Sequence, residues 1–146
     1  MATNIDRPNG LYPVRHKDGT PYAGQNNYYY VPSTDATAIF VGDAVTHKGS
    51  SGAAGVRVNG VDVEGMPLVG QTAAGDSAIV GVVVGVVPDP TTPERKYRAA
   101  STAAVLMVAD DRSLIFEVQE DSDTCTLAAA EVGRNYDLVV GTGSTT

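Results

Sequence analysis

The chain has 146 residues and a mass of 15.1 kDa, which suits one domain with its own hydrophobic core. Its formal charge of −7 would repel a phosphate backbone, which argues against nucleic-acid binding. Cys125 is the only cysteine, so an intrachain disulfide is excluded. The first residues lack a signal-peptide pattern and no segment reads as a membrane span, so we expect a soluble protein made inside a cell.

Residues 1–25 are punctuated by proline and glycine, a pattern that predicts an extended arm. The arm holds too many apolar side chains for a solvated tail, so we expect it to dock on its own β domain or on a neighbour. The residues concerned are Ile5, Leu11, Tyr12, Val14 and Tyr22.

The segment 26–141 is predicted to be a β domain, because short apolar runs alternate with turn signals. Strands are expected at 27–31, 38–41, 45–48, 69–72, 78–87, 97–108, 114–118 and 138–140, and a flexible loop at 49–55. The pair Asn59–Gly60 predicts a tight hairpin. Gly81 and Gly85 lie inside the most apolar strand, where glycine indicates a bend or a close backbone approach.

One short helix is expected near 126–132, capped by Thr126 and ended by Gly133, followed by a fraying tail at 142–146. The whole pattern predicts an all-β fold, either a single jelly-roll-like sandwich or a small barrel. Propensity alone does not rank these architectures.

The sequence gives little sign of catalysis. His16 and His47 lie in polar segments without a metal-ligand spacing, and both are predicted to be surface residues. Cys125 follows the polar, acidic run Asp121–Thr124, and nearby acids oppose thiolate formation. The acids Glu117, Glu120, Asp121 and Asp123 lack the order of a calcium loop. We therefore expect no catalytic residue, no metal site and no cofactor, and a protein that is not an enzyme.

Tyrosine carries most of the aromatic mass, with five of the seven tyrosines in the first thirty residues. In the strand 27–31, Tyr28 and Tyr30 face one side and Tyr29 the other, so the three cannot all be ordinary core. Tyrosine is also favoured at interfaces. Interface contact and packing in the barrel wall remain equally open for this run.

Several sequence segments resemble segments of the small head decoration, or cement, proteins of tailed bacteriophages. They are Asp6–Gly10, Tyr30–Asp35, Phe40–Asp43, Tyr97–Thr102 and Ile115–Asp121. The resemblance extends from Asn4 to about Gly141 and includes no catalytic signature.

The resemblance implies a jelly-roll-like β domain on the outer capsid surface of a virion. Such a protein would bridge major capsid subunits as a homo-oligomer, with a homodimer expected and a homotrimer as the alternative, and without nucleic-acid or membrane partners. The candidate interface residues are Ile5, Leu11, Tyr12, Val14, Tyr22, Tyr28, Tyr29 and Tyr30. The rival function is a carbohydrate- or receptor-binding β module, because exposed tyrosines can stack on sugars.

Overall fold

The computed structural model describes residues 10–73, 76, 78–119, 128–136, 138, 140 and 141. The strands in these residues are β1 (Tyr12–His16), β2 (Asn27–Val31), β3 (Ala44–Ser51), β4 (Arg57–Val58), β5 (Val61–Asp62), β6 (Pro67–Gln71), β7 (Gly81–Val86), β8 (Ala104–Ala109) and β9 (Leu114–Glu117). A short 3-10 helix, η1, covers Ala129–Glu131. No helix among the described residues is long and apolar enough to cross a membrane.

Five strands close into a barrel in the order β2-β6-β3-β7-β8. All neighbours are antiparallel except β2 and β6, which run parallel and meet at Tyr30 and Leu68. Closure leaves no strand of this sheet with an unpaired edge. The all-β prediction and the small barrel are thus confirmed, whereas a jelly roll is not.

The barrel interior is mostly aliphatic, as the scarcity of phenylalanine and the lack of tryptophan predict. Alternation along β2 points Tyr29 and Val31 inward, where they join a cluster contributed by every strand of the barrel. Its other buried members are Ile39, Val45, Val69, Val83, Leu106 and Val108.

Both glycines of β7 have the roles that the sequence predicts. A Cβ on Gly81 would lie 2.3 Å from the carbonyl oxygen of Ala109, so only glycine permits this approach of β7 to β8. Gly85 follows a register shift after Val83, which marks a β-bulge in the same pair of strands. The bend and the close approach together help the sheet to close.

The hairpin β4–β5 turns at Asn59 and Gly60, whose φ angles of 50° and 82° confirm the predicted turn with two positive φ values. Val58 and Val63, at this hairpin, are buried in a second apolar cluster with Val105 on the outer face of the barrel. Tyr30 packs against the same cluster, so the hairpin covers part of the outward side of β2 and β8.

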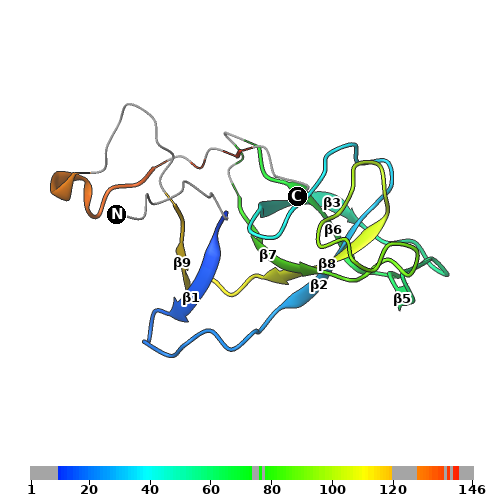
Figure 1. The fold of residues 1–146 in the computed structure, drawn as a ribbon, viewed down its shortest axis with the longest axis horizontal. Helices are drawn as coiled ribbons and strands as arrows, with labels where there is room; N and C mark the ends of the chain where they lie inside the picture. Colours follow the sequence, from blue (N-terminus) through cyan, green and yellow to red (C-terminus); the bar gives the residue numbers. More distant parts are fainter. Residues whose placement is uncertain are drawn as a thin grey trace, which may run out of the picture.

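Strands β1 and β9 form a separate antiparallel ribbon, which stands beside the barrel in Figure 1. A bulge at Val14 shifts the register between Pro13 and Arg15. Pro13 and Leu114 are buried, and β1 contacts β7. The ribbon therefore has one face toward the protein and another toward solvent.

Some local predictions are wrong. Residues 38–41 form only a single bridge, Ile39 to Arg98, because Gly42 turns the chain and Asp43 accepts the amide proton of Phe40. The loop expected at 49–55 begins as strand, since β3 extends to Ser51. Only the second half of the strand expected at 97–108 is extended, beginning at Ala104.

The C-terminal predictions fall partly outside the described residues. The described residues 128–132 of this region contain the three-residue η1, preceded by Ala128, and Gly133 follows it with a φ of 85°. The expected cap Thr126 and the tail 142–146 lie outside the described residues, as does residue 139 of the strand expected at 138–140. Leu138 and Val140 are not in a strand.

Candidate interaction surface

Among the described residues, His16, Ser113 and Asp111 form an arrangement that resembles catalytic machinery. His16 Nδ1 lies 3.0 Å from Ser113 Oγ and 3.4 Å from Asp111 Oδ2. A catalytic triad needs its hydroxyl and carboxylate on opposite ring nitrogens, but here both meet Nδ1. This cluster therefore fastens the end of β1 to the turn before β9. His16 was predicted to be a surface residue, but it is half-buried. His47 is exposed, as predicted.

The carboxylate of Asp110 is hydrogen-bonded to side chains of the barrel strand β2. Its Oδ2 accepts a 2.7 Å hydrogen bond from the hydroxyl of Tyr29 and a 3.0 Å bond from Asn27 Nδ2. Burial, followed by this contact with Asp110, raises the pKa of Tyr29 to about 12. Asp110 and Tyr29 thus tie the turn after β8 to the core strand β2.

Asp43 is the acid whose pKa is raised by burial. Its Oδ2 accepts hydrogen bonds of 2.9 Å from the amide of Phe40 and from Gln71 Nε2, and these bonds oppose that shift. Both bonds hold the turn before β3, so a structural role explains the perturbed pKa.

Arg98 is the charged residue that sequence reasoning missed, and it is only 1% exposed. Its guanidinium donates to the carbonyls of Pro32, Asp35, Thr37 and Thr102. Burial lowers the pKa of Arg98, and the neighbouring carboxylate of Asp35 opposes that shift. These oxygen acceptors occupy the N–H groups of the guanidinium, which therefore holds two loops together. No N–H group of Arg98 remains to bind a ligand.

Of the remaining candidate acids, the structure describes Glu117. Glu117 is exposed at the end of β9, opposite Tyr12, whereas Glu120, Asp121, Asp123 and Cys125 lie outside the described residues. Within the part of the chain that the structure describes, no group of three or more metal-ligating side chains could hold an ion.

A small cavity lies beside Arg98, between the loops that precede β8 and the end of β7. Its volume is about 20 Å³, with Asn59, Val87 and Tyr97 among the lining residues. This space suits one water molecule. It is too small for a sugar ring.

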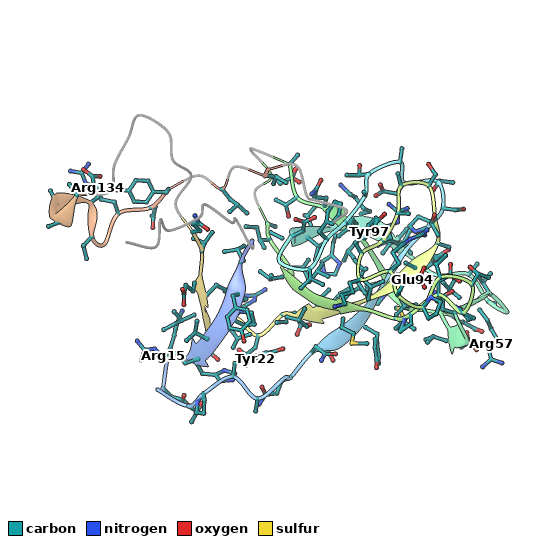
Figure 2. All side chains as sticks on the ribbon, viewed as in Figure 1. Arg15, Tyr22, Arg57, Glu94, Tyr97 and Arg134 are labelled. Carbon is teal, nitrogen blue, oxygen red and sulfur yellow. The ribbon has the colours of Figure 1, made fainter. Side chains whose placement is uncertain are left out.

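The solvent-facing part of the ribbon is the strongest candidate for binding. Tyr12 is 68% exposed and Val14 41%, and Val118, directly after β9, is 55% exposed. We call Tyr12 and Val14, with Arg15 and Glu117, the ribbon surface; Val118 has the strand parity of the buried Leu114 and is not part of it. Arg15 extends away from the barrel at the outer side of β1, as Figure 2 shows.

The predicted interface residues separate into three groups. Tyr12, Val14 and Tyr28 are exposed, and Leu11, Tyr22 and Tyr30 are partly buried. Tyr29 belongs to the core, at 8% exposure, and Ile5 lies outside the described residues. The structure places Tyr22 beside Val14, because Tyr22 donates its amide proton to the carbonyl of Val14. Tyr28 lies apart from them, in the barrel wall.

The signal for this surface was present in the sequence only in part. Apolar residues among prolines and glycines identified Tyr12 and Val14 as candidates. Nothing local indicated that β9, about a hundred residues later, pairs with them, so Arg15 and Glu117 were missed as members of the same surface.

Comparison with known proteins adds no family to this description. No protein-family model matches the chain, and neither the curated proteins nor the solved structures gave a match.

Proposed function

We propose that this chain is a non-enzymatic structural protein of a tailed-phage virion. It is made in the host cytoplasm, binds the outer surface of the head, and bridges major capsid subunits to stabilise the shell. The proposal joins the sequence resemblance to one structural observation, the exposed Tyr12 and Val14 on a ribbon attached to a closed barrel.

The ribbon has the properties that a docking element requires. Tyrosine contributes a large apolar area together with a hydroxyl that hydrogen-bonds, and such residues often dominate interface energies. Tyr12 and Val14 are held in position by pairing with β9 and by the bonds of Tyr22 and His16 to neighbouring backbone and side chains. A pre-organised surface loses less conformational entropy on binding.

The closed barrel supports the ribbon on a unit with no free strand edge of its own. A jelly-roll topology is not needed for this role, because any rigid β domain would serve as the support. The charge of −7 favours solubility at high copy number before the shell surface becomes available.

Bridging would act through many weak contacts. An oligomer that touches several capsid subunits gains effective concentration once its first contact has formed. Preferential binding to one state of the shell then stabilises that state by mass action.

The test is cryo-electron microscopy and co-sedimentation of the purified protein with heads that lack it. Regular density that bridges capsomers is expected. Bare shells beside free protein would refute the proposal. Retention of the protein on a host polysaccharide, in a separate binding assay, would then favour the sugar-binding role.

A matched pair of double variants locates the docking surface. Tyr12→Ser/Val14→Ser removes the ribbon's exposed side chains and should abolish co-sedimentation. Tyr28→Ser/Val56→Ser removes the same residue types from two other exposed positions, one in β2 and one just before the β4–β5 hairpin. This variant should leave binding unchanged. The opposite pattern would place docking on the barrel and contradict the role of the ribbon.

A further inference from the structure

The two edges of the β1–β9 ribbon differ. The outer edge of β1 is covered by residues 20–22, since His16 donates to the carbonyl of Thr20 and Tyr22 to that of Val14. Arg15 and Pro21 form a bridge at the same place. Along β9, in contrast, no strand of the described residues pairs on the side away from β1. An open edge of this kind is a template for another strand.

The backbone groups of β9 that face this edge follow from the ladder. Lys17 donates to the carbonyl of Ser113 at 2.8 Å, and bonded and non-bonded pairs alternate in an antiparallel ribbon. The pairs His16–Leu114 and Pro13–Phe116 are therefore the non-bonded ones. Pro13 fits this assignment because it has no amide proton. Phe116 consequently directs its N–H and C=O away from β1.

We propose that this edge of β9 pairs with the same edge of a second copy of the chain, antiparallel across a two-fold axis. Phe116 faces Phe116 of the second copy, and the two ribbons join into one continuous sheet. In this register Leu114 lies opposite Val118 of the second copy, and Ile115 lies opposite its Glu117.

The sequence of β9 favours this register over its neighbours. A shift that centres the pair on Glu117 would bring two carboxylates directly opposite one another, which is destabilising. A shift that centres it on Ile115 would leave Val118 beyond the paired hydrophobic residues and opposite Arg112. The register centred on Phe116 places Leu114 to Val118 opposite itself without opposing like charges. The Leu114 amide already donates to the carbonyl of Asp111, so the new backbone bonds centre on Phe116.

Charge complementarity supports a second copy as the partner. Arg15 pairs with Ile115 within one ribbon, and Ile115 faces Glu117 of the second copy on the same face of the sheet. Arg15 and that Glu117 are then two strand spacings apart, about 10 Å between backbones, a gap that these two side chains together span. The two-fold axis creates this contact twice.

The inference does not depend on a capsid role, because it concerns the protein alone in solution. It leaves Tyr12 exposed, and the two-fold axis places both copies of Tyr12 on the same face of the joined sheet. A dimer would then present the ribbon surface twice.

Sedimentation equilibrium of the full chain across a concentration series tests the pairing, and a dimer is expected. Arg15→Glu alone and Glu117→Arg alone should each weaken the dimer roughly tenfold, because each turns two attractive contacts into repulsive ones. An equimolar mixture of the two single variants should restore dimerisation as a heterodimer, since both contacts become attractive again.

Arg57→Glu and Glu94→Arg are the matched controls, with the same charge changes at exposed positions on other elements, both labelled in Figure 2. They should leave the dimer unchanged. A wild-type chain that stays monomeric throughout overturns the proposal. So does a dimer that the Arg15 and Glu117 variants do not weaken, or that their mixture does not restore.

Hydrogen exchange at the Phe116 amide supplies an independent readout. Protection should appear as the dimer forms and fall when the protein is diluted to monomer. Protection that does not change with concentration would mean that a segment of the same chain covers the edge, and the proposal would be wrong.

Discussion

The guanidinium of Arg98 and the carboxylate of Asp35 lie 3.4 Å apart, with the arginine side chain fully enclosed and the aspartate partly open to solvent. The same guanidinium donates to main-chain carbonyls on both sides of Asp35. Ile39 and Arg98 also exchange backbone hydrogen bonds. Arg98 thus supplies the segment 32–39 with the hydrogen-bond donors that a neighbouring strand would otherwise provide.

Replacing Arg98 should be among the most damaging single changes in the chain. Arg98→Met keeps the aliphatic stem but leaves buried carbonyls and the Asp35 carboxylate without their donors, at a cost of about 3 kcal/mol or more. Urea unfolding followed by circular dichroism measures the loss.

Arg95→Met is the matched control for that experiment. Arg95 lies 5.8 Å from the centre of the Tyr97 ring and makes no comparable set of backbone bonds. Its replacement should cost less than about 1 kcal/mol. Equal losses for the two variants would contradict the role assigned to Arg98.

The glycines of β7 should tolerate alanine very differently. Gly81→Ala places a methyl group against the backbone of Ala109, which cannot yield without moving β8, so a loss of about 1–3 kcal/mol is expected. Gly85→Ala meets the sulfur of Met107 at 3.3 Å, and that flexible side chain can move aside. Its stability should change by less than about 1 kcal/mol. Thermal unfolding of the two variants, compared with wild type, decides whether close approach is the reason for Gly81.

Tyr29 should make stability depend on pH in the alkaline range. Its pKa of about 12 in the folded protein exceeds the ordinary value of 10.0, so folding favours the neutral phenol. The corresponding stability is complete below pH 10 and is lost as the pH rises through about 12. Urea unfolding at a series of alkaline pH values should show this loss.

Tyr29→Phe isolates that contribution from other groups that titrate in the same range. The variant lacks the hydroxyl that donates to Asp110 and should be less stable at neutral pH, but its stability should fall less steeply above pH 10. Parallel pH profiles for the variant and wild type would show that Tyr29 ionises without regard to folding.

The local features of the fold were the predictable ones. Alternation in β2 correctly separated Tyr29 from Tyr28 and Tyr30, because side-chain direction in a strand follows from spacing alone. The turn at Asn59–Gly60 was equally readable, since few residue pairs adopt two positive φ values. Neither feature required knowledge of distant parts of the chain.

The features that failed depend on contacts between distant segments. Residues 38–41 have strand propensity, yet the bonds of Ile39 with Arg98 and of Phe40 with Asp43 hold them in an irregular path. The interface prediction selected the early tyrosines by residue type and so included Tyr29, which packs in the core, while Glu117 was not grouped with Tyr12. Propensity does not encode which strands become neighbours.

The ribbon joins strands that flank the entire barrel in the sequence, and its contact between His16 and Ser113 spans 97 residues. Closing so long a loop is entropically costly unless the intervening chain is already compact. We therefore expect the barrel to form first and to bring the two strands together. We also expect the ribbon to open while the barrel stays closed, at the surface where the protein is proposed to meet its partners.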